Sequence, residues 1–300
     1  MKKIIPILIV LLYFQVTLAQ ENVRYNHILI TNDDGVEDSD RLFALAKSVK
    51  KVSKRVSIVV SSFDRSGTSN HTTFGKHQST LEVTCMYYDK ENNITFYVIP
   101  GNPADCIVLG LNALFPDDKP DLVLSGINGG ANIGPGWFGS GTIGAIRMSA
   151  FLGVRGIALS GFDDDDERSF EVIPQWITQF ISSAIMDEID KNSYLTIGFP
   201  EIPLEEIKGV KVADRRISYD EPDSIVFYKI HGDDPHKPKN TTVWALKHLG
   251  NPIDTSVKYD DIYLKEGYIV ITPMSINENN TKLLSAFQIG MDQIPQFSLK

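Results

Sequence analysis

The sequence is poor in cysteine and in basic side chains, and each shortage narrows the possible functions. Cys85 and Cys106 are the only cysteines among 300 residues. A chain with 42% apolar residues can bury a large core without a disulfide, so we expect two free thiols. Lysine and arginine total 29 against 38 acidic residues, which gives a formal net charge of −9. This balance argues against a broad electrostatic grip on a nucleic-acid polymer. A small anionic substrate still fits if a metal or helix N-termini supply local positive potential.

Long apolar runs are absent except at the N-terminus. Two lysines precede an apolar stretch from Ile4 to about Leu18, and small residues follow that permit cleavage before Gln20. We therefore predict a signal peptide over residues 1–19 and export of the mature chain to the periplasm or the medium. An uncleaved membrane anchor is the alternative. No other stretch approaches the roughly 18 apolar residues of a membrane span, so we expect no membrane association after cleavage.

The stretch His-Ile-Leu-Ile-Thr-Asn-Asp-Asp-Gly at residues 27–35 carries the strongest chemical signal. Its apolar run is typical of a parallel strand buried on both faces, and Asn32, Asp33 and Asp34 follow where that strand leaves the sheet. In open α/β sheets, ligands bind beyond the carboxyl ends of the strands. Adjacent aspartates repel each other unless a proton or a cation separates them, and Mg²⁺ or Mn²⁺ suits such oxygen ligands. A polar turn that merely ends a strand is the alternative on this segment alone.

Four later turns combine glycine with hydroxyl or amide side chains, at residues 61–71, 101–106, 126–136 and 140–142. Exposed backbone amides at a helix N-terminus suit a phosphate, and the turns at 101–106 and 140–142 each precede a predicted helix. The third turn has five glycines in eleven residues but matches neither the P-loop nor the G-x-G-x-x-G pattern. It therefore gives no evidence for ATP or NAD. Plain helix caps and polar loops explain each of these turns equally well when it is taken alone.

Strands and helices alternate over most of the chain, which predicts an α/β fold with a doubly wound, mainly parallel sheet. A hairpin insertion is expected at residues 80–99, and the polar region 214–254 holds two short β-like pieces at 225–230 and 242–246. Protruding hairpins of this kind often mediate oligomer contacts. Further strands are predicted at 56–60, 121–125, 156–160, 194–199, 210–212 and 267–272, and helices at 38–51, 103–114, 140–152, 172–185 and 281–291.

Five motifs, in their order and approximate spacing, resemble the SurE survival-protein family of metal-dependent 5′/3′-nucleotidases. They are Ile-Thr-Asn-Asp-Asp-Gly (30–35), Ser-Gly-Thr-Ser-Asn (66–70), Gly-Asn-Pro-Ala-Asp-Cys (101–106), Ser-Gly-Ile-Asn-Gly-Gly-Ala-Asn-Ile-Gly (125–134) and Ser-Gly-Thr (140–142). The resemblance runs from about residue 26 to 275. It implies one domain over residues 20–300, with a Rossmann-like three-layer core at about 26–200. It also implies a C-terminal extension at about 210–300, whose β-hairpin serves a homodimer or homotetramer.

The resemblance also implies a set of site residues. One divalent metal ion per subunit, Mg²⁺ or Mn²⁺, would be held by Asp33, Asp34, Ser66 and Asn128. The two aspartates would be catalytic as well, and which of them orients or deprotonates the attacking water stays open. The phosphate would lie in a cradle of five residues, Asn32, Asn102, Ser140, Gly141 and Thr142. Each metal ligand lies at the carboxyl end of a predicted strand or just after it, which agrees with the reading from the residues alone.

The sequence departs from the family pattern at several positions. Asn102 stands where the family usually has Thr, and Arg147 stands where the family usually has Glu after the Ser-Gly-Thr turn. The family also usually has an acidic residue near the position of Gly136. The loop before Ser66 is one residue shorter, and the family's basic segment is here Ala-Asp-Arg-Arg at 213–216. These departures bear on substrate choice and oligomer packing more than on the metal site.

We therefore predict hydrolysis of phosphomonoesters, foremost 5′(3′)-nucleoside monophosphates, and export suggests scavenging of external nucleotides. A non-catalytic nucleotide- or phosphate-binding protein on the same fold is the alternative, since the changes at Gly136 and Arg147 leave turnover open. A haloacid-dehalogenase-type phosphatase fits less well, because it needs a second Asp two residues after the first, whereas Asp33 and Asp34 are adjacent.

Overall fold

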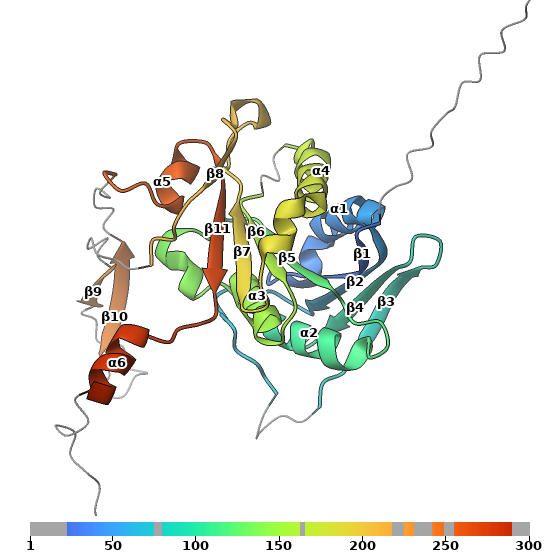
Figure 1. The fold of residues 1–300 in the computed structure, drawn as a ribbon, viewed down its shortest axis with the longest axis horizontal. Coiled ribbons are helices and arrows are strands. Elements are labelled where there is room, and N and C mark those ends of the chain that lie inside the picture. Colours follow the sequence, from blue (N-terminus) through green and yellow to red (C-terminus); the bar gives the residue numbers. More distant parts are fainter. Residues whose placement is uncertain are drawn as a thin grey trace, which may run out of the picture.

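The computed structural model describes residues 23–74, 80–162, 166–217, 225–230, 242–248 and 255–289 (Figure 1), so the predicted signal peptide lies outside the described residues. The helices are α1 (Ser39–Val49), α2 (Pro103–Leu109), α3 (Gly141–Phe151), α4 (Ser169–Ser182), α5 (Asp260–Lys265) and α6 (Thr281–Ile289). The strands are β1 (Tyr25–Thr31), β2 (Ser53–Ser61), β3 (Thr84–Asp89), β4 (Ile94–Ile99), β5 (Leu122–Asn128), β6 (Gly156–Ser160), β7 (Ser193–Gly198), β8 (Val210–Val212), β9 (Ile225–Ile230), β10 (Val243–His248) and β11 (Ile269–Ser275).

Nine of the described strands form one sheet in the order β3-β4-β2-β1-β5-β6-β7-β11-β8. The strands from β4 to β7 in this order are parallel, and β1 lies between β2 and β5, so that Ile30 pairs with Ile58 on one side and Leu124 on the other. β3 runs antiparallel to β4, and β11 runs antiparallel to β7. The predicted α/β class with a mainly parallel sheet is confirmed.

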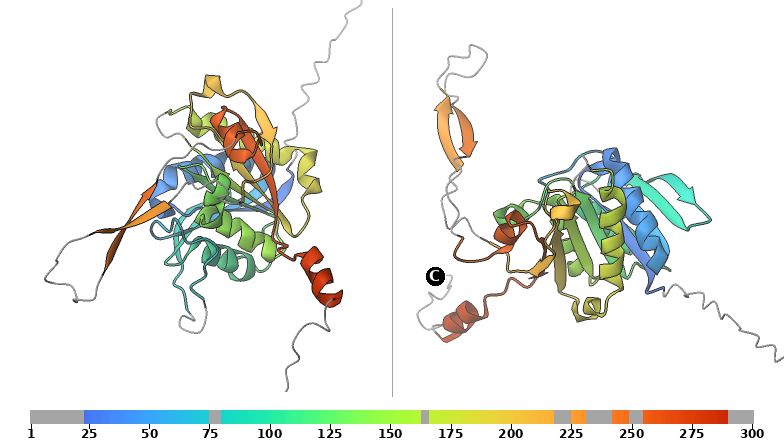
Figure 2. Two further views of the ribbon diagram at one scale, coloured as in Figure 1. Left: turned by 90° about the vertical axis from the view of Figure 1, so that its left-hand side faces the viewer. Right: turned by 90° about the horizontal axis from the view of Figure 1, so that it is seen from above.

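Helices cover both faces of the sheet, as Figures 1 and 2 show. Ile28 and Ile30 of β1 pack in one core with apolar residues of α1 and α4, whereas Leu29 packs in a second core with residues of α2 and α3. This alternation follows from the two-residue period of a strand, which sends successive side chains to opposite faces. A continuous apolar run in β1 therefore fills both layers, as expected for a central parallel strand.

Two sequence-based details need correction. The predicted hairpin at residues 80–99 exists, but it is not an insertion, because β4 pairs in parallel with β2 inside the main sheet. The physical reason is that Ile94, Phe96 and Ile99 are buried and need a neighbouring strand as well as β3. The predicted first strand of that hairpin also begins later, at Thr84 rather than at residue 80. Strands β8 and β11, from the C-terminal part of the chain, complete the far edge of the same sheet.

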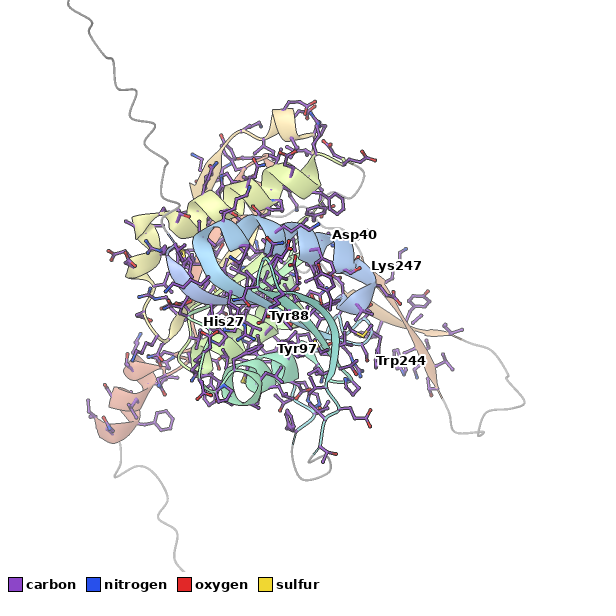
Figure 3. All side chains as sticks on the ribbon, turned by 90° about the vertical axis from the view of Figure 1, so that its right-hand side faces the viewer. His27, Asp40, Tyr88, Tyr97, Trp244 and Lys247 are labelled. Carbon is purple, nitrogen blue, oxygen red and sulfur yellow. The ribbon has the colours of Figure 1, made fainter. Side chains whose placement is uncertain are left out.

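Neither the buried histidine of β1 nor the two cysteines belong to the predicted site. His27 is fully buried, bonded to the Asp118 carbonyl at 2.7 Å and to the Ser57 hydroxyl at 2.9 Å, and burial lowers its pKa (Figure 3). Cys106 is buried in the second core, which raises the pKa of its thiol to about 12, and Cys85 is exposed on β3. Both cysteines are free, as predicted.

Two elements extend away from the main body. β9 and β10 form an antiparallel hairpin outside the large sheet. α6 follows β11 after a connection at residues 276–280 and also projects from the main body (Figure 2). Trp244 and Lys247 lie on this hairpin, away from the helical layers (Figure 3). The predicted β-pieces at 225–230 and 242–246 therefore match a real hairpin, which we call the hairpin arm. Among the described residues, no helix is both long and apolar enough to cross a membrane.

The loop after β2 packs directly on α3 at Gly144. A Cβ at this position would lie 1.9 Å from the carbonyl oxygen of Ser69, so only glycine fits without moving the loop. Replacing a helix-interior glycine by alanine normally stabilises a protein. We predict instead that Gly144→Ala lowers the free energy of unfolding by about 1–3 kcal/mol, because it overpacks this contact.

Denaturant unfolding measures this effect, with Gly139→Ala as the matched control. Gly139 has φ −90° and no atom within 4 Å of an added Cβ, so this control is expected to change stability by less than about 0.5 kcal/mol. A stabilised Gly144→Ala variant would show that the loop does not pack on α3 in solution.

Candidate active site

The carboxyl ends of β1 and β2 meet the N-terminus of α3 at Asp33. The Asp33 carbonyl accepts a hydrogen bond from the Arg65 N–H at 2.7 Å, which ties the loop after β2 to the end of β1. A Cβ on Gly141 would lie 2.9 Å from the Asp33 Cβ and 3.2 Å from the Arg65 carbonyl oxygen. The missing side chain at Gly141 therefore lets all three segments touch.

Asp33 is buried, with 3% of its surface exposed. Its Oδ1 accepts a hydrogen bond of 2.6 Å from the Thr142 hydroxyl, in the first turn of α3. Burial raises the pKa of Asp33, and the Thr142 hydrogen bond opposes this rise because it stabilises the carboxylate. Thr142, predicted as a phosphate ligand, is thus in direct contact with the first aspartate.

The pKa of the Asp34 carboxyl is strongly raised by its surroundings. Burial, followed by the charge of Asp33, raises the pKa of Asp34 to about 7, while the Arg41 guanidinium, 3.9 Å from Oδ2, lowers it. That Oδ2 atom is buried and has no hydrogen-bond partner among the described residues. Two neighbouring carboxylates, one with an unpartnered oxygen, are unfavourable without a compensating positive charge.

Arg41 of α1 connects Asp34 to the end of β5. One of its guanidinium nitrogens pairs with Asp38 at 2.5 Å, and another donates to the Ile127 carbonyl at 2.9 Å. Asn128 follows directly, and its Nδ2 donates to the Gly130 carbonyl, which turns the amide oxygen to the opposite side. Arg41 therefore links Asp34 to the residue directly before the predicted ligand Asn128.

Ser66 reaches this group through the loop after β2. Its N–H donates to the Asp64 carboxylate at 2.7 Å, and hydrogen bonds from Ser66 lower the pKa of Asp64. The preceding residue, Arg65, donates its N–H to the Asp33 carbonyl, so the exposed Ser66 follows directly after the contact between this loop and the first aspartate.

The residues predicted to hold phosphate fall into two groups. Ser140 caps α3, its Oγ accepting the Ile143 N–H at 3.1 Å, so the start of α3 with Gly141 and Thr142 faces Asp33. Asn32 and Asn102 brace backbone instead. Asn32 bonds to both the N–H and the carbonyl of Gly35.

Asn102 caps α2 and ties the loop after β2 to that helix. Its Nδ2 donates to the His71 carbonyl at 3.2 Å, and its N–H donates to Asp105 at 2.8 Å. The fully buried Asp105 also accepts three hydrogen bonds from the N–H and hydroxyl of Thr73. The Asn102 side chain is thus engaged in fixing the loop that carries Ser66.

The donor set suits a hard divalent cation. Among the described residues, no three His, Cys, Asp or Glu side chains cluster as a ready-made metal site, so hydroxyl and amide oxygens have to complement the two aspartates. Oxygen ligands of this kind favour Mg²⁺ or Mn²⁺. A dication would give the buried Asp34 oxygen its missing partner and would offset the repulsion between the carboxylates. The residues present therefore fit such an ion.

The departures from the family pattern lie beside this group. The Arg147 guanidinium sits over the Trp137 ring at 5.3 Å and within 3.5 Å of the Ser69 hydroxyl. Arg147, Trp137 and Asn70 line a cavity of about 310 Å³ along α3. At Gly136 an added Cβ would meet nothing within 4 Å. Neither substitution disturbs the two aspartates.

Sequence reasoning missed three residues that connect to the site: Asn132, Arg215 and Asp260. Asn132 lies in the glycine-rich turn, but nothing in its spacing distinguishes it from the neighbouring polar residues. The segment around Arg215 was noted only as a departure. Arg215 and Asp260 form a buried ion pair whose partners are 45 residues apart, which no local pattern could reveal.

The fold and the site together define a Rossmann-like α/β protein with an acidic, oxygen-lined site at its strand ends. The chain belongs to the survival protein SurE family, whose sequence model matches residues 28–220.

Relatives match nearly the whole chain. A 5′-nucleotidase SurE of Chlorobium phaeobacteroides is 29% identical over 268 residues, covering 89% of this chain and 97% of that protein. The 5′-nucleotidase SurE of Campylobacter lari is 33% identical and covers 83% and 92% respectively. The crystal structure of the SurE protein from Aquifex aeolicus superposes with a TM-score of 0.68 at 27% identity, over 89% of this chain and all of that one.

The raised pKa of Asp34 has a consequence for stability. Since the folded-state pKa is about 7, above roughly 3.9 for a free Asp, the folded protein holds a proton that the unfolded chain releases. Without metal, stability therefore falls as pH rises from about 4 to about 7. We predict that Asp34→Asn raises the Tm of the chelator-treated protein at pH 8 by roughly 2–4 °C, which corresponds to about 1 kcal/mol.

Scanning calorimetry at pH 8 and pH 5 measures this change. At pH 5 the wild-type carboxyl is already neutral, so the gain should largely disappear. An equal gain at both pH values would mean that Asn improves packing rather than removing a buried charge.

Proposed function

We propose that the protein is a metal-dependent phosphomonoesterase that hydrolyses nucleoside monophosphates, with both 5′ and 3′ esters as substrates. The observation that carries this proposal is the contact between Asp33, the first of the paired aspartates, and the N-terminus of α3 through Thr142 and Gly141. The 5′-nucleotidase relatives, which match most of the chain, support the same reading.

The start of α3 is suited to hold the phosphate. This helix has eleven residues, and its first backbone amides are free of intrahelical partners except where Ser140 caps one of them. Such amides, together with the helix dipole, attract an anion. Gly141 keeps the approach open, because any side chain there would collide with Asp33. Ser140, Gly141 and Thr142 then form the cradle.

The two aspartates have distinct environments and therefore distinct roles. Asp33 is fixed by the Thr142 hydrogen bond, which favours its carboxylate against the effect of burial, whereas burial raises the pKa of Asp34 to about 7 and its Oδ2 has no hydrogen-bond partner among the described residues. That pKa describes the metal-free site, where Asp34 can hold a proton at neutral pH, and the proton is released when Asp34 binds the ion as a carboxylate. Asp33, Asp34, Ser66 and Asn128 are the proposed ligands of one Mg²⁺ or Mn²⁺ ion. When bound, that ion activates water and neutralises developing charge on the phosphate.

A second candidate is a non-catalytic nucleotide-binding protein. One observation favours it: Arg147 brings a cation where the family usually has Glu, beside the cavity along α3. A cation there strengthens anion binding without contributing to hydrolysis. The intact aspartate pair favours the enzyme, because a binding protein has no need for two buried, mutually repelling carboxylates.

Phosphate release from a panel of 5′- and 3′-nucleoside monophosphates tests the proposal. With Mn²⁺ or Mg²⁺ the mature protein is expected to release phosphate, and a chelator should stop it. Asp33→Asn should lower the rate by about 100-fold or more, since it replaces the carboxylate of a proposed metal ligand by a neutral amide.

Asp40→Asn is the matched control, because Asp40 is an exposed carboxylate on α1 that is not among the proposed ligands (Figure 3). Nucleotide binding by calorimetry without phosphate release, under all metal conditions, would establish the binding protein instead.

We also propose that the mature chain is exported after cleavage behind Ala19. The two lysines, the apolar stretch and the small residues before Gln20 support this, although they lie outside the described residues. An exported nucleotidase would recover nucleosides and phosphate from external nucleotides.

We further propose a homodimer or homotetramer built through the hairpin arm and α6. The hairpin arm exposes Phe227, Tyr228 and Trp244, each at least half exposed, and an isolated two-stranded hairpin is marginally stable in water. α6 likewise exposes Leu283, Leu284, Phe287 and Ile289. Exposed apolar surface of this extent marks an association site.

Native mass spectrometry of the exported protein tests both proposals at once. The subunit mass should match residues 20–300, and the assembly should contain two or four subunits. Phe287→Asp should shift the assembly toward smaller species, because it places a charge in a buried contact, whereas Tyr88→Asp, a similarly exposed aromatic on β3, should not. A full-length subunit mass would refute cleavage, and a monomeric wild type would refute association.

A further inference from the structure

A continuous line of interactions joins Asp33 to the base of the hairpin arm. Thr142 donates to Asp33 at 2.6 Å, and Asn132 Nδ2 donates to the Thr142 oxygen at 3.0 Å. Arg215 donates to the Asn132 carbonyl at 2.7 Å and forms an ion pair with Asp260 at 2.8 Å. The line therefore crosses from the end of β1, through α3 and the glycine-rich turn, to the C-terminal part of the chain.

The bond from Asn132 decides where the Thr142 hydroxyl points. A hydroxyl has one hydrogen to donate, and it can accept through its lone pairs. Because Asn132 donates to this oxygen, the single hydrogen of Thr142 is left for Asp33. If the amide were reversed, its oxygen would compete with the Asp33 carboxylate for the same hydrogen. The observed orientation is the one in which both bonds form.

Asn132 itself is held from both sides. Its N–H donates to the Ser160 hydroxyl at 3.0 Å at the end of β6, and its carbonyl accepts from Arg215. Arg215 also donates to the Thr196 hydroxyl of β7. The turn that carries Asn132 is thereby fixed to the sheet, although it lies in a glycine-rich segment with little intrinsic rigidity.

The Arg215–Asp260 pair anchors this arrangement. The two side chains are 2% and 1% exposed, and buried charges persist only when they are well paired. Asp260 also accepts the Gly134 N–H at 2.9 Å and the Arg216 N–H at 3.0 Å, so both of its carboxylate oxygens are hydrogen-bonded. Breaking the pair would leave an unpaired buried charge, so any shift of Arg215 from its observed position is energetically costly.

We propose that Asn132 and Arg215 are positioning residues for the metal site: Arg215 fixes Asn132, and Asn132 aims the Thr142 hydroxyl at Asp33. This inference rests on the proposed function only in taking Asp33 as a metal ligand. Holding Oδ1 leaves Oδ2 of Asp33 available to a cation. Hydrogen-bond partners of this kind typically change metal affinity or activity by about 10- to 100-fold when they are removed.

Direct Mn²⁺ binding to the mature protein, measured by calorimetry without nucleotide, tests the proposal. Thr142→Val removes the hydroxyl at constant shape, and Asn132→Asp replaces the donor by an acceptor while leaving both backbone contacts of Asn132 intact. Each should weaken Mn²⁺ binding about 10- to 100-fold. The double variant should lose only about 2- to 3-fold more than Thr142→Val, because both changes act through one hydroxyl. Thr142→Ser keeps the hydroxyl and should recover affinity relative to Thr142→Val.

Arg215→Met removes the buried ion pair with Asp260 and the contact to Asn132, and it should weaken Mn²⁺ binding as well. Arg168→Met is its control, since Arg168 pairs with Asp166 and Glu205 at the surface, and this variant should bind Mn²⁺ like the wild type. Unchanged affinity in Thr142→Val or Asn132→Asp, fully additive losses in the double variant, or a wild type that does not bind Mn²⁺ would each overturn the proposal. Phosphate release by the wild type is scored separately. If the variants lose Mn²⁺ affinity in the expected non-additive way but the wild type hydrolyses no nucleotide, the positioning role is supported and the nucleotidase is refuted.

Discussion

The repulsion between two adjacent, buried carboxylates is the constraint on which the site depends. Asp33 and Asp34 follow a strand buried on both faces, and Asp33 has 3% of its surface exposed while the Asp34 side chain is 18% exposed. Three features offset this repulsion: the Thr142 hydroxyl that donates to Asp33, the Arg41 guanidinium 3.9 Å from Asp34, and the N-terminus of α3. These contacts are too few to satisfy every oxygen, and the remaining deficit is what a cation can fill. Without a bound cation, the neighbouring carboxylates are therefore an energetically unfavourable arrangement, and it lies at the proposed site of catalysis.

Glycines let the segments around the two carboxylates pack closely against one another. At Gly35, φ is +83° and an added Cβ would lie 2.7 Å from the carbonyl carbon of Phe63, so the turn after β1 can lie against the loop after β2 only with glycine. Gly141 and Gly144 play the same part where α3 meets Asp33 and Ser69. Helix propensity would favour alanine at both helical positions, and the site overrides it.

Sequence alone predicted what depends on local pattern. The apolar run before Asp33, the helix start at Ser140 and the hairpin arm follow from periodicity, capping and turn composition, and the structure has all three. The membership of β4 in the main sheet was missed, because a short alternating strand does not reveal its second neighbour. The bracing by Asn32 and Asn102 was also missed, since an amide beside a turn looks the same whether it faces a ligand or its own backbone.

The contacts that sequence could not reveal join the C-terminal part of the chain to the site. Arg215 and Arg216 precede the hairpin arm, and Asp260 and Asp261 follow it, so two ion pairs at 2.8 Å and 3.0 Å close the base of the arm. The same Arg215 contacts Asn132, and the same Asp260 contacts Gly134. Residues remote in sequence come to share one buried network, in which a displaced charge is costly at both ends.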